Sequence, residues 1–139
     1  MRNVVPEIEL GMRTAFIDST VESNLAYKPQ FLSNDYRNGQ KLLSYLDEEL
    51  LNCDEFSISV AFITMGGITP LLQTLQELEK RGVRGRILTT DYLTFSEPAA
   101  LDKLASLKNI ELRLFCATKE EGFHTKGYIF KKDQLYRII

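Results

Sequence analysis

The sequence predicts an α/β fold with a mixed, mainly parallel β-sheet flanked by helices on both faces. Stretches with leucine at helical spacing alternate along the chain with short runs of β-branched and aromatic residues, and this alternation is typical of strand–helix–strand units. Parallel neighbours of this kind are joined by right-handed crossovers, so we expect two such connections. With 139 residues and a mass of 15.9 kDa, the chain is long enough to bury one core.

Leucine spacing and helix-end residues predict three helices. The first covers 39–52, the second 69–81 and the third 97–107. Thr69 caps the second helix, Pro70 occupies its first position and Gly82 ends it. Residues 1–38 lack such periodicity and are rich in turn-forming residues. We therefore expect an irregular N-terminal segment over 1–38 and a domain over 39–139.

Three runs, 56–63, 83–90 and 110–117, are predicted as parallel, central strands. The first has Ser57, Ser59 and Ala61 on one face, and we expect another segment to pack closely on these small residues. Runs 123–130 and 135–139 are close enough to form an antiparallel pair through 131–134. The chain stops within a β-type run, so we expect the fold to be truncated here and to continue in a longer protein.

Composition excludes several classes of function. The net charge of −2 gives no global attraction to nucleic acid. The two cysteines lie far apart and there is a single histidine, so we expect neither a zinc site nor another cofactor. No run approaches a membrane span and no signal-peptide pattern occurs, so we expect a cytoplasmic protein without a membrane partner.

The C-terminal stretch is locally basic. It could meet phosphates, or it could be a solvated strand edge whose lysines deter aggregation. The basic residues outnumber the acidic ones: Lys119, Lys126, Lys131, Lys132 and Arg137 against Glu120, Glu121 and Asp133.

His124 and Lys126 are the candidate catalytic residues. Two positions apart on a strand, their side chains would share a face and lie roughly 7 Å apart. One phosphate could then contact both, with the imidazole attacking phosphorus and the ammonium holding the oxygens. Tyr128 and Phe130 would share that face, where buried unpaired charge is costly, and Gly127 would allow close approach of a ligand. The alternative is a single histidine that is partly buried and hydrogen-bonded.

A second candidate site lies where the first predicted strand ends. Ligands of open α/β sheets bind beyond the carboxyl ends of parallel strands, here 64–67 and 89–92. Thr64, Gly66 and Gly67 precede a helix and are candidate phosphate-binding residues. The alternative is a tight turn without a ligand.

The run 123–130 resembles the H-x-K motif of the phospholipase D superfamily. Together with 59–64, Gly67-Ile68 and 88–94, it resembles one branch, the phospholipase D-like nuclease domain at the N-terminus of bacterial DEAD/DEAH-type helicase proteins. The match covers about 30–139. It implies a metal-independent phosphodiesterase acting on DNA within a larger helicase or restriction-type protein, with His124 as nucleophile and Lys126 holding the phosphate. A second histidine protonates the leaving oxygen, and a homodimer could bring two copies of His124 together for this step.

The sequence departs from the superfamily pattern in two ways. The acid five residues after the lysine is replaced by Lys131, with Asp133 the nearest acid, and the Gly-Ser-x-Asn segment would fall beyond Ile139. Catalysis is therefore expected of the parent protein. Two other functions stay open: a non-catalytic nucleic-acid-binding or dimerisation module with the same fold, and a structural α/β domain with the histidine in its core.

Overall fold

The computed structural model describes residue 6 and residues 32–35, 37–118 and 121–139. The chain divides into two compact units, 1–42 and 43–139. The division into an irregular segment over 1–38 and a domain over 39–139 stays a prediction. Most of the predicted irregular segment over 1–38 lies outside the described residues.

The described part of the first unit is a tight turn closed by Asp35. Its backbone exchanges two hydrogen bonds with Gln40, of 2.9 and 2.8 Å. Its carboxylate accepts from the Asn38 side chain at 2.7 Å and from the backbone N–H groups of Arg37 and Asn38. These donors, the Asn38 side chain first, lower the pKa of Asp35. Asn34 accepts from the N–H of Leu42 at 2.9 Å, which satisfies one of the free donors at the start of the first helix.

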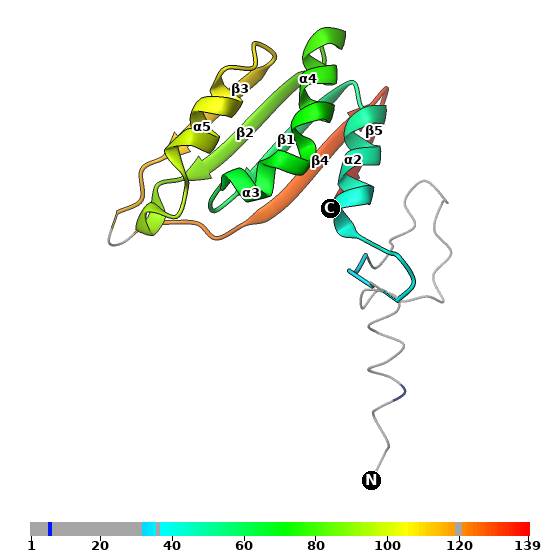
Figure 1. Ribbon diagram of the computed structural model, residues 1–139, viewed down its shortest axis with the longest axis horizontal. Helices are drawn as coiled ribbons and strands as arrows, with labels where there is room; N and C mark the ends of the chain where they lie inside the picture. The colour runs from blue at the N-terminus through cyan, green and yellow to red at the C-terminus, as the bar shows by residue number, and fades with distance from the viewer. Residues whose placement is uncertain (1–5, 7–31, 36, 119–120) are drawn as a thin grey trace. The chain divides into compact units, whose positions relative to one another are not determined.

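The second unit is built on a five-stranded sheet with the order β3-β2-β1-β4-β5 (Figure 1). The strands are β1 (Glu55–Val60), β2 (Arg84–Thr90), β3 (Ile110–Phe115), β4 (Lys126–Lys132) and β5 (Leu135–Ile138). The β1–β2 and β2–β3 pairs are parallel, whereas β1–β4 and β4–β5 are antiparallel. The α/β class, the mixed sheet and the C-terminal antiparallel pair are confirmed. The three strands predicted to be parallel are parallel to one another, as expected. The prediction that all three are central is wrong, because β3 forms an edge. The sheet is also not mainly parallel, since two of its four strand pairs are antiparallel.

The three predicted helices are present with shifted ends. They are α2 (Leu42–Asn52), α4 (Leu72–Arg81) and α5 (Pro98–Ala105), accompanied by the short helix α3 (Met65–Ile68) and the 3₁₀ turns η2 (Thr69–Leu71) and η3 (Tyr92–Thr94). The 3₁₀ turn η2, which contains Pro70, takes the place of the predicted first turn of α4. Gly82 ends α4 as predicted, with φ of 71°, and its N–H donates to Leu78 and Glu79.

All the helices of the second unit lie on the same side of the sheet in Figure 1. The strand residues that face them are buried, among them Phe56, Ile87, Ile110 and Phe130, and so are Leu50, Leu78 and Leu104 of the helices. Together they form the core. The prediction of helices on both faces is therefore wrong for the described part of the chain. The chain moves from β1 to β2 to β3 in one direction, and two right-handed crossovers in one direction place α4 and α5 on one face.

The opposite face of the sheet is a shallow groove. It is lined by Ser57, Ser59, Arg86, Leu88, Glu111, Arg113, Gly127, Ile129 and Ile138. Leu88 and Ile129 are exposed there, and a Cβ at Gly127 would meet no atom within 4 Å. The close packing expected on Ser57 and Ser59 therefore does not come from any described segment.

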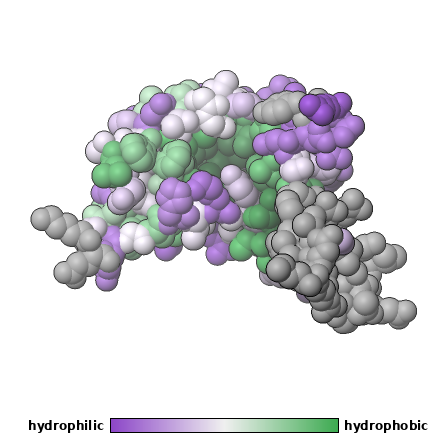
Figure 2. Space-filling view, turned by 90° about the horizontal axis from the view of Figure 1, so that it is seen from below, coloured by the Kyte–Doolittle hydropathy of each residue, from purple (hydrophilic) through white to green (hydrophobic). Residues whose placement is uncertain are grey.

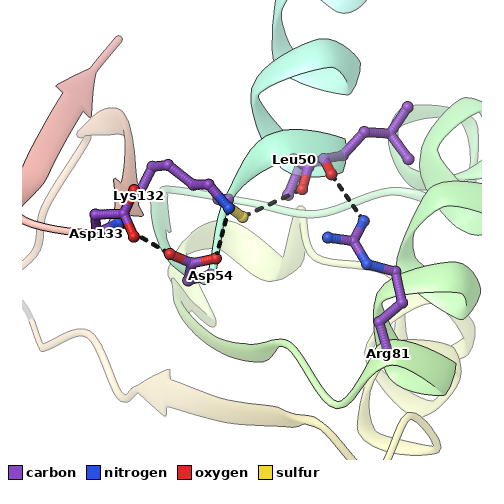
Figure 3. A network of polar contacts seen from close by, with 7 residues as sticks. Leu50, Asp54, Arg81, Lys132 and Asp133 are labelled. Atoms are coloured by element: carbon purple, nitrogen blue, oxygen red, sulfur yellow. Dashed lines mark hydrogen bonds and ion pairs between the residues drawn. The ribbon is translucent and has the colours of Figure 1, made fainter.

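A polar network joins the start of β1 to the turn between β4 and β5 (Figure 3). The Asp54 carboxylate accepts from Lys132 Nζ and from the N–H of Asp133, both at 2.9 Å. Arg81, the last residue of α4, donates to the carbonyl of Leu51 at 2.7 Å. This network holds the far end of β4, the strand that begins at Lys126.

Gly85 is required by the ring of Phe56, which lies 1% exposed in the core. The two residues are paired across β1 and β2, and a Cβ at position 85 would overlap the Phe56 ring.

None of the helices in the described part of the chain has the length and apolar character needed to cross a membrane.

We expect Gly85→Ala to lower the free energy of unfolding by about 1–3 kcal/mol, because the added methyl group overpacks the core. Chemical denaturation measures this change, and the same substitution in a Phe56→Leu background should cost less, since the two sites are coupled. The matched control is Gly127→Ala, where the Cβ meets open space. An equal loss of stability in the two glycine variants contradicts this account.

We expect Asp54→Asn to weaken the acid sensitivity of the fold. The Asp133 N–H, followed by the Lys132 side chain, lowers the pKa of Asp54 below its usual 3.8. Asp54 therefore contributes stability above its unfolded pKa and loses it as the pH falls through the folded pKa. Thermal unfolding from neutral pH down to about pH 3 should show a smaller decline in Asp54→Asn than in the wild type. Asp102→Asn, on exposed α5 surface, should keep the wild-type decline.

Candidate functional site

The carboxyl ends of β1, β2 and β3 share one edge of the sheet, and the segment 121–125 enters β4 at this edge. The N–H of Ala61 donates to the carbonyl of Thr125 at 3.1 Å. β4 itself begins at Lys126, so His124 precedes the strand. The prediction that His124 and Lys126 both lie on a strand is therefore wrong for His124. β1 ends at Val60, the partner of Lys126, and beyond it the chain turns towards α3, so the ladder stops.

His124 and Lys126 are nevertheless brought together, because both lie against the ring of Phe62. The His124 ring is 6.4 Å from the Phe62 ring, centroid to centroid, with planes inclined by 63°. Lys126 Nζ lies 6.0 Å from the Phe62 centroid, within the range of a cation–π contact. The two groups that the H-x-K pattern requires thus share one aromatic neighbour.

The strand face that carries Lys126 changes from core to surface along β4. Phe130 is buried, Tyr128 is half-buried, and both Lys126 and His124 are exposed. Burial raises the pKa of the Tyr128 phenol. Because Lys126 and His124 are exposed, the expected cost of burying unpaired charge on this face does not arise. The alternative of a histidine held in the core is also excluded by this exposure.

A second aromatic ring extends the site. Phe95, which follows η3, packs edge-on against Phe62 with the ring centroids 5.8 Å apart and an interplanar angle of 73°. We call Phe62, Phe95, His124 and Lys126 the edge cluster. Phe62 and Phe95 remain 41% and 53% exposed, and the neighbouring Tyr92 is 44% exposed. On the side of the molecule seen from below the view of Figure 1, hydrophobic (green) side chains lie beside hydrophilic (purple) ones (Figure 2).

The buried hydroxyl of Ser96 joins the segment that carries Phe62 to the segment that carries Phe95. It donates to the carbonyl of Thr90, at the end of β2, at 2.8 Å, and accepts from the N–H of Ile63 at 3.3 Å. The N–H of Glu97 adds a bond to the carbonyl of Ile63 at 2.8 Å. Phe62 and Phe95 each precede a member of this network in the chain, so the network brings their rings into contact.

The loop between Thr90 and Ser96 has an unusual backbone. Leu93 and Thr94 have φ of 50° and 55°, a left-handed conformation that is unfavourable for residues with a Cβ and most of all for β-branched ones. Hydrogen bonds hold both ends of the loop: Thr90 Oγ1 accepts from the N–H of Tyr92 at 2.7 Å, and Ser96 donates to the Thr90 carbonyl. Strained backbone of this kind is enriched at functional sites.

The turn with the predicted phosphate-binding residues is occupied by the protein's own acceptors. Thr64 caps α3 and accepts from the N–H of Gly67 at 3.1 Å. The Glu97 carboxylate accepts from the N–H of Met65 at 2.7 Å. A Cβ at Gly66 would meet open space. The geometry therefore gives no support to an anion at Thr64, Gly66 and Gly67, and the tight-turn alternative accounts for these contacts.

The other motif residue and most of the basic stretch lie away from the edge cluster. Lys131 stands at the position of the motif acid. In the β1–β4 ladder its register partner is Glu55, at the opposite end of β1, roughly 16 Å along β4 from Lys126. Asp133 lies beyond it, in the turn to β5. Lys132 and Arg137 form ion pairs with Asp54 and Glu49. The basic stretch is therefore not one continuous surface, and Lys119 and Glu120 lie outside the described residues.

Within residues 32–35, 37–118 and 121–139, no group of three or more His, Cys, Asp or Glu side chains is arranged to hold a metal ion. Comparison of the chain with models of known protein families and with curated proteins found no significant match.

Sequence reasoning singled out His124 and Lys126 but missed Phe62, Phe95 and Ser96 as parts of the same site. The run 56–63 is predicted as one strand, whereas β1 ends at Val60 and leaves Phe62 beyond it, 41% exposed. A signal was nevertheless present. Tyr92 and Phe95 are aromatic residues in the loop after a parallel strand, where ligands of α/β sheets bind.

We expect Ser96→Ala to lower the free energy of unfolding by about 1–3 kcal/mol, because the Ile63 N–H and the Thr90 carbonyl each lose a buried partner. Denaturant unfolding measures this loss. Ser106→Ala removes a hydroxyl that donates to the Lys103 carbonyl at 2.7 Å on the surface and should change stability by less than about 0.5 kcal/mol. A Ser96 variant as stable as the Ser106 variant would show that the network does not hold the edge.

Proposed function

We propose that this chain is a phospholipase D-like phosphodiesterase domain that acts on DNA, with His124 as nucleophile and Lys126 as the phosphate-binding cation. One observation carries the proposal. The two residues are exposed and lie against the same ring, Phe62, at the edge where α/β sheets bind ligands. An exposed imidazole can reach a phosphorus atom, and a nearby ammonium offers a point charge to the phosphate oxygens.

In this reaction a neutral imidazole nitrogen attacks phosphorus and forms a phosphohistidine, while the P–O bond to the leaving oxygen breaks. A second histidine gives that oxygen its proton, and water then hydrolyses the phosphohistidine. Because the chain contains one histidine, the proposal includes a homodimer that brings two copies of His124 together. The resemblance further implies a domain within a larger helicase or restriction-type protein, and the proposal includes this parent chain.

A second candidate function is a non-catalytic module that binds nucleic acid or mediates dimerisation. Two observations favour it. The His124 ring has no hydrogen-bond partner among the described residues, whereas catalytic imidazoles are usually oriented by one. Lys131 also replaces the acid of the superfamily motif. Binding without cleavage is the result that this function requires.

We expect the full-length protein to cleave a chromogenic phosphodiester in the presence of EDTA, since the resemblance implies a metal-independent reaction. His124→Ala should abolish cleavage by removing the nucleophile. Lys126→Ala should lower the rate by about 10²–10³-fold, the usual cost of one lost electrostatic contact to the transition state. Both variants should unfold at the wild-type denaturant concentration, because both side chains are exposed.

Lys103→Ala is the matched control, because Lys103 is an exposed lysine near the end of α5 and should leave the rate unchanged. Cleavage that requires added metal, or that survives His124→Ala, contradicts the proposed mechanism. Unchanged binding of DNA by a protein without cleavage would support the second candidate instead.

A further inference from the structure

We infer that the edge cluster binds single-stranded DNA by stacking an unpaired base on its phenylalanine rings beside the phosphate held by Lys126. This inference rests on the proposed function and names its substrate class. It concerns Phe62 and Phe95, which no step of phosphoryl transfer requires.

Both rings keep large exposed surfaces although the core is only one residue away in the chain. Ala61 and Ile63, on either side of Phe62, are 2% and 6% exposed, and Ser96 after Phe95 is 8% exposed. Phe62 and Phe95 therefore point outward from chain segments whose neighbouring residues are buried. An exposed apolar ring costs solubility without contributing to the core, and a pair of them fixed in one place indicates a contact surface.

The composition of the edge cluster matches the parts of a nucleotide. An aromatic face accepts a base by stacking, and this is tolerant of sequence because every base has a π-face. Lys126 Nζ lies 6.0 Å from the centre of the Phe62 ring. A base can therefore stack on the cluster while its own phosphate contacts Lys126. A membrane or protein surface would not require a histidine and a lysine against the ring.

The charge of the site favours a single strand over a duplex. Duplex binding relies on several phosphate contacts, but Lys132 and Arg137 of the basic stretch are already paired with acids. Lys126 forms no ion pair with any described residue. Among the described residues of the basic stretch, Lys126 and Lys131 are therefore the lysines without an ion pair. Stacking must then supply much of the affinity, and the bases of an intact duplex present no free face for it.

The backbone of the loop that carries Phe95 is consistent with this role. The loop contains two left-handed residues, Leu93 and Thr94, and its ends are joined by the buried Ser96 hydroxyl, which donates to the Thr90 carbonyl. A preorganised ring loses little conformational freedom on binding, which preserves affinity. Ser96 thus acts as a positioning residue for the stacking surface.

The test measures binding of fluorescein-labelled oligo-dT, of a blunt-ended duplex and of pyrophosphate to the full-length protein. We expect oligo-dT to bind more tightly than the duplex. Phe95→Ala and Phe95→Leu should each weaken oligo-dT binding about tenfold while duplex and pyrophosphate binding stay unchanged. Phe95→Tyr should retain wild-type affinity, since it keeps the aromatic face.

Tyr136→Ala is the matched control. Tyr136 is another exposed ring with a lysine, Lys131, 6.0 Å from its centre, but it lies on β5, away from His124. Its removal should leave oligo-dT binding unchanged. A plot of the logarithm of the association constant for oligo-dT against the logarithm of salt concentration should have a slope of about −0.7 for each phosphate contact. A shallow slope that corresponds to one or two contacts supports stacking.

Equal affinity of the wild type for oligo-dT and duplex, or equal effects of Phe95→Ala and Tyr136→Ala, would overturn the inference while leaving the proposed function intact. So would a Phe95→Ala variant that loses self-association in sedimentation but binds oligo-dT normally, because the rings would then pack against a second copy. Failure to bind all three ligands, together with absence of cleavage, would instead remove the proposed function.

Discussion

The buried hydroxyl of Ser96 is the constraint on which the candidate site depends. It joins the carbonyl of Thr90, at the end of β2, to the N–H of Ile63, just beyond the end of β1. Two chain segments that diverge after their strands are thereby held side by side. Because Phe62 and Phe95 each precede a bonded residue, their rings meet, and His124 and Lys126 settle against Phe62. A buried hydrogen-bond network thus determines which aromatic side chains lie together on the surface.

The sheet imposes a second constraint through its connectivity. Both crossovers run in the same direction and have the same hand, so α4 and α5 lie on one face (Figure 1). That face holds the core, in which the ring of Phe56 occupies the space left by Gly85. The other face carries exposed Leu88 and Ile129 beside charged side chains. The far end of β4 is fixed by Asp54 and Lys132 (Figure 3).

Much of the fold could be predicted from the sequence, because its signals are local. Leucine spacing located α2, α4 and α5, and Gly82 correctly indicated the end of α4. The spacing of His124 and Lys126 predicted that the two side chains lie close together, and both lie against the ring of Phe62. The acid expected in the motif is absent, and Asp133 lies in the turn beyond Lys131, far along β4.

The sequence by itself determined the α/β class, the order of helices and strands, and the identity of the two ionisable residues at the site, since periodicity and residue type act within a few positions of the chain. Only the tertiary structure decided that the helices share one face, that β3 is an edge strand, and that His124 lies before β4. It alone decided that Lys132 and Arg137 are neutralised by partners distant in sequence while Lys126 is not. The physical reason is the same in each case. Strand order, ladder ends and ion pairs depend on contacts between segments that local patterns do not encode.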